Sequence, residues 1–307
     1  MFEILFLGTS ASAPSVHRGL SSQIVMRDEH RFLIDCGEGT QRQILQSGVG
    51  FKRLNRILIT HAHLDHILGL AGLLSTFMRW ETIDYLQLYA GRHALERIHD
   101  LLYGIVLRGA KAPMPVELCE IKPGLLFDED DFTVTAFPVQ HRGPDCYGFA
   151  FEEKSRRPFL NDRATELSVP FGPERKRLVA GEAIALADGR VITPEDVLGE
   201  VQRGTKFVFM ADVGRTHDLV NVCREADALV VEATYLDVEA DMAKQFGHLT
   251  ARQAAALARD AGVGHLYLTH ISRRYREKEV IEEARSVFPN TTVARDFDHY
   301  KITRNSE

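Results

Sequence analysis

A short cluster of metal-ligand side chains, placed where a predicted strand gives way to a helical pattern, constrains this chain more than any other feature. The apolar residues 56–59 predict a strand, and the ligand-type side chains that follow it are His61, His63, Asp65 and His66. Alternate side chains leaving a strand point the same way, so His61 and His63 can bind one metal ion. Asp65 and His66 lie on the next turn and can face a second ion. Imidazole and carboxylate ligands without cysteine are typical of an open, catalytic zinc site.

Four ligand-type side chains do not complete two metal sites. A lone histidine in an apolar segment is more often a core residue than a ligand, but four candidates within six positions favour a metal. A ligand-type residue shortly after an apolar strand recurs at His141, Asp212 and His270. Active sites of layered α/β proteins gather at strand ends, so we expect these three residues to complete the centre.

Strand and helix patterns alternate along most of the chain and predict one domain, residues 1–307, of the α/β or α+β class. The predicted strands are 2–7, 23–26, 31–34, 56–59, 86–89, 116–121, 133–137, 148–151, 207–210, 228–231, 265–268 and 292–294. The predicted helices are 65–77, 219–225, 251–260 and 277–287. Mixed elements of this kind imply sheets covered by helices.

Residues 154–204 break this alternation, because they are rich in charge, Pro and Gly and show little core pattern. A stretch of that length without such a pattern is usually functional or disordered. We interpret 154–200 as an inserted, flexible arm. A tolerated surface insertion explains the composition equally well.

The bulk composition restricts the partners and the compartment. A net charge of −6 does not favour nucleic-acid binding, because such proteins usually carry a basic excess. Binding depends on where charge lies, however, and the inserted segment contains Arg156-Arg157 and Arg175-Lys176-Arg177. The four cysteines form no Cys-x-x-Cys pair, no apolar run is long enough to span a bilayer, and the N-terminus lacks the features of a signal peptide. We therefore expect a cytoplasmic location and no membrane association.

These motifs, taken in order, resemble the metallo-β-lactamase superfamily, whose signature is His-x-His-x-Asp-His with later His, Asp and His ligands. Within it the chain is similar to the ribonuclease Z family, endonucleases that trim the 3′ end of precursor tRNA. The resemblance covers nearly the whole chain. The segments that carry it are Phe6-Leu7-Gly8-Thr9, 35–41, 188–199, Glu232-Ala233-Thr234, His248-Leu249-Thr250, 268–275 and Ala294-Arg295-Asp296-Phe297. At Gly37-Glu38-Gly39 we expect a tight turn behind the metal centre, with Asp35 and Glu38 as candidate partners of ligating histidines.

The resemblance implies a four-layer αβ/βα sandwich with an inserted, protruding arm. It also implies two Zn²⁺ ions per chain, with Mn²⁺ or another divalent ion as a substitute. By resemblance, the first ion is held by His61, His63, His141 and Asp212, and the second by Asp65, His66, bridging Asp212 and His270. Asp65, His248 and Glu232 are the implied catalytic residues, with His248 as proton donor oriented by Glu232. The implied partners are precursor tRNA, bound in part by Arg175, Lys176 and Arg177, and a second copy of the chain.

Two other functions compete with a zinc-dependent endoribonuclease. One is a hydrolase of the same fold that acts on small phosphodiesters, thioesters or lactones, which has no need of a basic extension remote from its metals. The other is a non-catalytic binding protein, which would be free to lose ligands, whereas all seven are present here. Three stretches depart from the family pattern, namely 14–19, 172–179 and 211–213.

Overall fold

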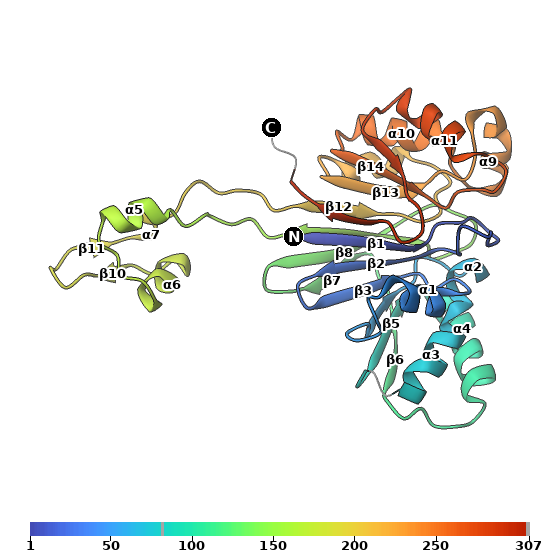
Figure 1. Ribbon diagram of the computed structural model, residues 1–307, viewed down its shortest axis with the longest axis horizontal. Helices are drawn as coiled ribbons and strands as arrows, with labels where there is room; N and C mark the ends of the chain where they lie inside the picture. Colours follow the sequence, from blue (N-terminus) through green and yellow to red (C-terminus); the bar gives the residue numbers. More distant parts are fainter. Residues whose placement is uncertain (81–82, 305–307) are drawn as a thin grey trace. The chain divides into compact units, whose positions relative to one another are not determined.

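Two seven-stranded sheets form the larger part of the computed structural model, which describes residues 1–80 and 83–304 (Figure 1). Among the described residues, the first sheet has the order β16 (His299–Ile302), β1 (Phe2–Gly8), β2 (Ser22–Arg27), β3 (His30–Ile34), β4 (Arg56–Leu58), β5 (Leu86–Ala90) and β6 (Val116–Glu120). The second has the order β15 (Thr291–Val293), β14 (His265–Thr269), β13 (Ala228–Glu232), β12 (Lys206–Phe209), β9 (Tyr147–Glu153), β8 (Phe132–Pro138) and β7 (Gly124–Asp128). The strands from β3 to β6 and from β12 to β15 run parallel.

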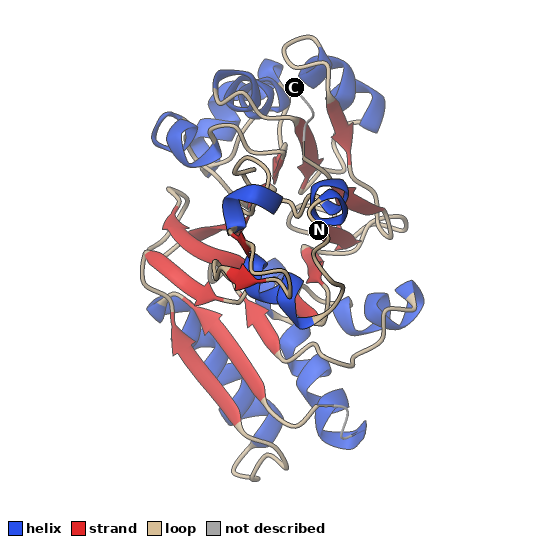
Figure 2. Cartoon of the chain, turned by 90° about the vertical axis from the view of Figure 1, so that its left-hand side faces the viewer, coloured by secondary structure: helices blue, strands red, loops and turns tan. Residues whose placement is uncertain are grey.

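Helices cover the outer face of each sheet, so the larger unit has four layers (Figures 1 and 2). The first sheet is covered by α1 (Thr40–Ser47), α3 (Gly69–Trp80), α4 (Arg92–His99) and the helical turns Asp100–Leu107. The second is covered by α8 (Val220–Cys223), α10 (Ala251–Asp260) and α11 (Glu277–Arg285). The predicted four-layer αβ/βα sandwich is therefore confirmed.

The space between the two sheets is filled largely by aromatic side chains. Phe2, Phe32, Phe132 and Phe151 are fully buried there. Their rings meet edge to face, with centroids 5.5 Å apart for Phe2 and Phe132 and 5.6 Å apart for Phe32 and Phe151. Such pairs add to the stabilisation that burial of the rings provides. Because helices and the opposite sheet cover both faces, β1 is almost entirely buried and its sequence is a nearly continuous apolar run.

Local sequence explains most of the predicted elements and also the elements that the prediction missed. Helix α10 begins after Thr250, whose hydroxyl accepts the N–H of Gln253, and its small buried alanines allow close packing on the sheet. Among the missed elements of the larger unit are α1, α4, α9 (Ala240–Phe246), β7 and β16. They carry short or weak apolar patterns: α1 buries only Thr40 and Ile44, and β16 buries Ile302 alone. The predicted helix 65–77 is divided into α2 (Leu64–Ile67) and α3.

Residues Glu153–Gly204 form a second compact unit. It contains α5 (Asn161–Glu166), α6 (Pro173–Val179), α7 (Pro194–Val197) and the hairpin of β10 (Ile184–Ala185) with β11 (Val191–Ile192). Its small core consists of Ala164, Val169, Leu178, Ile184, Ile192 and Val197. Five of these positions lie on short helices and two-residue strands, and Val169 lies in the loop between α5 and α6, so the sequence shows no periodic pattern that would predict them.

Two glycines allow the segment after β3 to pack against the start of α3. The N–H of Gly69 donates to the carbonyl of Cys36 at 2.8 Å, and the N–H of Cys36 donates to the carbonyl of His66 at 2.7 Å. A Cβ atom on Gly69 would lie 2.0 Å from the carbonyl oxygen of Gly37, and one on Gly37 would lie 2.5 Å from that of Asp65. No side chain fits at either crossing. The contact fixes the turn that carries Asp65 and His66.

We predict that Gly69→Ala lowers the free energy of unfolding by about 1–3 kcal/mol, because its methyl group meets backbone that cannot turn aside. Chemical denaturation followed by circular dichroism would measure the change. Gly104→Ala is the matched control, since a Cβ there meets nothing within 4 Å. Equal stability of the two variants would show that the crossing tolerates a side chain.

Candidate metal centre

The predicted ligands all lie at the ends of strands or on the turn that follows. His61 follows β4, and Asp65 and His66 lie on α2. His141, Asp212 and His270 follow β8, β12 and β14 of the other sheet. The structure brings these side chains together where the two sheets meet. Two of the groups able to share a metal are His61, His63, His141 and Asp212, and then Asp65, His66 and His270.

The Asp212 carboxylate lies between the two groups. Its Oδ2 is 3.5 Å from the Nε2 atoms of both His61 and His141. Its Oδ1 is 3.6 Å from Nε2 of His66 and 3.4 Å from Nε2 of His270. Each carboxylate oxygen therefore faces a different set of imidazoles, which is the arrangement of a bridging ligand.

His63 and Asp65 extend the two sets. Nδ1 of His63 is 3.3 Å from Nε2 of His141 in the first set. Oδ2 of Asp65 is 3.4 Å from Nε2 of His270 and 3.7 Å from that of His66 in the second. Ligands about 2.1 Å from a tetrahedral ion lie about 3.4 Å from one another. The observed separations match that value.

Buried polar atoms without partners point to cations in this site. Nε2 of His61, Nε2 of His66 and Oδ1 of Asp212 are buried and make no hydrogen bond. Such orphaned atoms are rare, because burying an unsatisfied polar group costs about 1–3 kcal/mol. The residues present therefore fit a divalent metal.

Two of the proposed ligand histidines have the neutral state that metal binding requires. Burial lowers the pKa of His61, and it lowers the pKa of His63 to about 4, so both are neutral imidazoles at neutral pH. A histidine must be neutral to bind a metal. Burial also lowers the pKa of His66, but Asp35 and Asp212 outweigh it and raise the value to about 10. These carboxylates create the negative potential that a cation would neutralise.

The far nitrogens of the ligand histidines are engaged by a second layer of polar groups. Nδ1 of His66 is 2.7 Å from Oδ2 of Asp35, and Nδ1 of His141 is 2.6 Å from the carbonyl of Gly247. Nδ1 of His270 is 2.9 Å from the hydroxyl of Thr234. Such contacts fix ring orientation and leave Nε2 for the metal.

Asp35, one of the two partners that the sequence predicted, also connects two elements of the site. Its Oδ1 accepts the backbone N–H of Thr60 at 2.8 Å, which fixes the segment that leads to His61. Glu38, the other candidate, is exposed and makes no hydrogen bond to a histidine of the described residues. The prediction for Glu38 is wrong because the chain turns away from the centre after Gly37.

His248 lies beside the two metal sets, in the loop between α9 and α10. Its ring centroid is 5.0 Å from that of His141 and 5.6 Å from that of His270. Nδ1 of His248 is 2.9 Å from Oε1 of the fully buried Glu232, whose carboxylate also accepts the N–H of Val213 at 2.7 Å. Burial lowers the pKa of His248, but Glu232 outweighs it and raises the value to about 9. The arrangement is a protonated imidazole oriented by a carboxylate.

His248 also stands close enough to Asp212 and His270 to join them around a metal. Its Nδ1 is 3.9 Å from Oδ2 of Asp212, however, and the shorter contact with Glu232 already engages that nitrogen. We therefore assign His248 to the outside of the metal sets.

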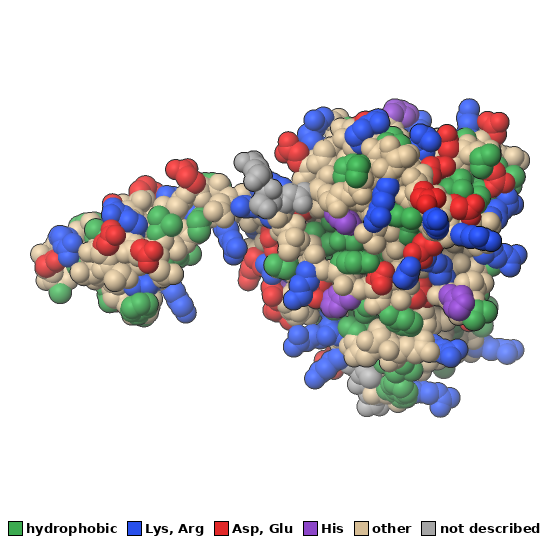
Figure 3. Space-filling model, turned by 45° about the horizontal axis from the view of Figure 1, so that its top comes forward, with side chains coloured by type: hydrophobic (Ala, Val, Ile, Leu, Met, Phe, Trp, Pro, Cys, Tyr) green, Lys and Arg blue, Asp and Glu red, His purple; other side chains and the backbone are tan. Residues whose placement is uncertain are grey.

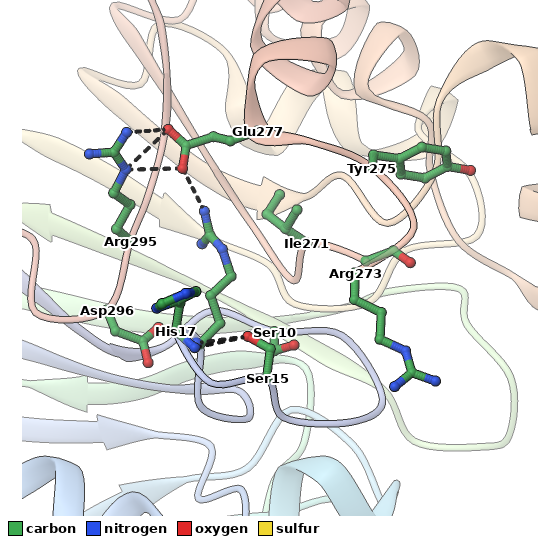
Figure 4. Close-up of a pocket in the computed structure, with 11 residues that line it drawn as sticks. Ser10, Ser15, His17, Ile271, Arg273, Tyr275, Glu277, Arg295 and Asp296 are labelled. Atoms are coloured by element: carbon green, nitrogen blue, oxygen red, sulfur yellow. Dashed lines mark hydrogen bonds and ion pairs between the residues drawn. The ribbon is translucent and has the colours of Figure 1, made fainter.

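A cavity of about 510 Å³ opens beside the centre, next to the residue that follows His270 (Figure 4). On one wall Glu277 pairs with Arg18 and Arg295 at 2.9 and 2.7 Å. Arg273 lies on another wall and has no hydrogen bond or ion pair to residues 1–80 or 83–304. The cavity therefore offers one free guanidinium. The sequence does not distinguish Arg273 from Arg274, because the two arginines are adjacent and nothing local separates them.

Comparisons with known proteins agree with this geometry. Residues 2–162 match the family model of the Anti-Pycsar protein Apyc1, and residues 189–271 match the beta-lactamase superfamily domain. Ribonuclease Z of Bradyrhizobium diazoefficiens is 47% identical over 302 residues, which cover 98% of this chain and 100% of that protein. Ribonuclease Z of Archaeoglobus fulgidus is 39% identical over 307 residues, covering 99% and 98%. The crystal structure of the short form of human tRNase Z matches with a TM-score of 0.69 and 27% identity over 98% of this chain and 99% of that one.

We predict that Asp35→Asn weakens metal binding by about 10–100-fold, because the amide cannot act as the charged acceptor for Nδ1 of His66. Competition with a chromogenic chelator would measure the affinity. Glu38→Gln serves as the control, since it removes a nearby carboxylate that does not reach the ligands. If Asp35→Asn binds metal as tightly as Glu38→Gln does, Asp35 does not tune the site.

Proposed function

The chain belongs to the ribonuclease Z family of the metallo-β-lactamase superfamily, and from that premise we propose that it cleaves precursor tRNA at its 3′ end and removes the trailer. The observation that carries the proposal is the Asp212 carboxylate, with one oxygen toward each of two imidazole sets. The donor set favours zinc, with Mn²⁺ or another divalent ion as a substitute. A cytoplasmic location remains a prediction.

Two cations bound by these side chains would supply charge neutralisation on the phosphate oxygens and a lowered pKa for water. The ligand sets proposed for them are His61, His63, His141 and Asp212 for the first, and Asp65, His66, Asp212 and His270 for the second. The identity of the ions as zinc, and their number, belong to the proposal.

Asp65 and His248 divide the proton transfers of the proposed hydrolysis. Oδ2 of Asp65 accepts the backbone N–H of Ser12 at 3.0 Å, which holds the carboxylate in place to orient the attacking water and accept its proton. His248 gives a proton to the departing 3′ oxygen, and Glu232 keeps its imidazole charged and oriented. The proposed base thus lies on α2 and the proposed acid in the loop between α9 and α10.

The cavity beside His270 is the proposed binding site for a nucleotide next to the cleaved bond. Its free cation, Arg273, suits a phosphate, because a guanidinium presents paired N–H donors to phosphate oxygens. The ion pairs of Glu277 keep the opposite wall in one conformation. An extended RNA strand would pass from this cavity into the metal centre.

The unit Glu153–Gly204 is the proposed tRNA-binding arm, acting across a homodimer. Its geometry distinguishes the three basic residues that the sequence suggested. Lys176 is exposed, whereas Arg177 pairs with Glu182 at 2.9 Å. Arg175 donates to Asn161 at 3.0 Å and to backbone carbonyls. Lys176 is therefore the strongest candidate of the three for contact with a phosphate.

We predict that the zinc-loaded protein cuts a precursor tRNA at the junction of its mature 3′ end and trailer, and that a chelator abolishes the cleavage. Elemental analysis should give two ions per chain. Asp65→Ala should lower kcat by about 10²–10⁴-fold, the range for loss of a general base. Turnover of a small phosphodiester without cleavage of precursor tRNA would instead support the alternative of a small-molecule hydrolase.

We predict that His248→Ala slows precursor cleavage by about 10²–10⁴-fold with unchanged metal content, because it removes the acid that protonates a poor leaving group. Hydrolysis of bis(4-nitrophenyl) phosphate should fall much less, since nitrophenolate needs little protonation. Comparing kcat for the two substrates measures the difference. Equal losses, or loss of metal, would remove His248 from the role of acid.

Glu232→Gln is the companion variant. Glu232 raises the pKa of His248, so in the parent the acid form persists to higher pH and is lost as pH rises through that pKa. Without the charge, the basic limb of the pH profile for precursor cleavage should move to lower pH. An unmoved limb would contradict the pairing.

A further inference from the structure

Phe171 is the most exposed aromatic side chain in the unit Glu153–Gly204, and the two residues that follow it restrict the backbone. Its relative exposure is 82%. Gly172 follows with φ 119° and ψ −138°, a conformation open to glycine and strained for other residues. Pro173 then begins α6 with a fixed φ. Gly172 and Pro173 therefore restrict the backbone conformation of the turn that carries Phe171.

One face of the Phe171 ring is backed by a guanidinium. The Cζ atom of Arg175 lies 3.6 Å from the ring centroid. Its N–H groups donate to the carbonyls of Pro170 at 3.3 Å and Val169 at 3.1 Å, and to Oδ1 of Asn161 at 3.0 Å. Among the described residues no carboxylate pairs with it. The Arg175 guanidinium, held by these hydrogen bonds, therefore covers one face of the Phe171 ring and leaves the other face to solvent.

Charge alone does not equip this unit to bind RNA. It contains nine Lys or Arg and nine Asp or Glu residues, and the two kinds are interspersed on its surface (Figure 3). Four of the arginines are paired within the unit: Arg157 with Glu195, Arg163 with Glu166, Arg177 with Glu182 and Arg190 with Asp188. A neutral surface of this kind provides little of the phosphate attraction that dominates most nucleic-acid binding.

We propose that Phe171 is a stacking platform for an exposed nucleobase of the substrate RNA, with Arg175 as the residue that positions the ring. The proposal rests on the proposed function and names the chemistry by which the arm holds its ligand. Structured RNA exposes base faces at loops, bulges and helix ends, where aromatic side chains stack on them. A ring already held in one orientation loses little conformational freedom on binding.

The test compares Phe171→Ala, Phe171→Leu and Phe171→Trp in cleavage of a precursor tRNA with a trailer. A stacked base is typically worth enough that its loss raises KM about 10- to 100-fold. We expect that rise for Ala and equally for Leu, which keeps apolar bulk but has no aromatic face, and a KM near that of the parent for Trp. The value of kcat should change little by comparison, because the step affected is binding. A parental KM for either Ala or Leu would overturn the proposal.

Salt dependence distinguishes stacking from attraction to phosphates. Phe171→Ala should raise KM by the same factor at every salt concentration. Lys176→Ala, which removes a neighbouring exposed cation, should instead reduce the slope of log KM against log salt by about one. If Phe171→Ala changes this slope as Lys176→Ala does, the ring acts only by positioning the nearby cations against phosphates. That result would exclude stacking.

Val191→Ala is the matched control, because Val191 is an exposed apolar residue of the same unit with a relative exposure of 62%. Its KM should equal that of the parent. A rise equal to that of Phe171→Ala would mean that loss of any exposed apolar side chain in the unit weakens binding, and would overturn the specific role of the ring.

Sedimentation of each variant tests whether Phe171 instead contacts a second copy of the chain. Dissociation of the Phe171→Ala variant alone would also overturn the proposal. A parent that does not cut precursor tRNA contradicts the proposed function itself. A parent that cuts while Phe171→Ala keeps its KM contradicts only the stacking platform.

Discussion

The buried carboxylate of Asp212, shared between two sets of imidazoles, is the contact around which the candidate metal centre is arranged. Burying a charge without a partner costs several kcal/mol, and here Asp212, Asp35 and Glu232 are all buried within one site. His270, His66 and His61 offset the burial and lower the pKa of Asp212 well below its ordinary value. Bound cations would offset the cost further and would stabilise the folded chain by mass action.

This centre is positioned by scaffold features that would be unfavourable elsewhere. Asp35 has φ 58° and His270 has φ 55°, left-handed backbone that non-glycine residues rarely adopt. Such residues persist only where the surroundings over-determine them. Asp35 is fixed by Thr60 and His66, and the N–H of Ile271, directly after His270, donates to the carbonyl of Thr9 at 2.8 Å. The strained backbone of Asp35 and His270 and these hydrogen bonds together orient the candidate ligands toward the metal centre.

The proposed recognition of RNA is divided between the cavity beside the candidate metal centre, in the larger unit, and the unit Glu153–Gly204. The metal sets and the His248–Glu232 pair belong to the larger unit, in which two sheets and their helices provide rigidity. The unit Glu153–Gly204 has its own small core and a balanced charge. The proposed recognition of RNA by this unit depends on how single side chains are oriented, among them Phe171 and Lys176, more than on a net positive charge.

The sequence alone determined the layered fold and the ligand candidates, because strand-end positions recur in a recognisable pattern around His61, His141, Asp212 and His270. His248 and Glu232 needed the added resemblance to a family, since an isolated histidine after a glycine has no local signature. Only the tertiary structure decided between Asp35 and Glu38, which are three positions apart, because the direction of the chain after Gly37 depends on its packing against Gly69. It also decided that Arg175 backs a ring while Lys176 faces solvent. Residue type fixes what a side chain can do, but contacts with residues distant in the sequence decide which side chains remain free to do it.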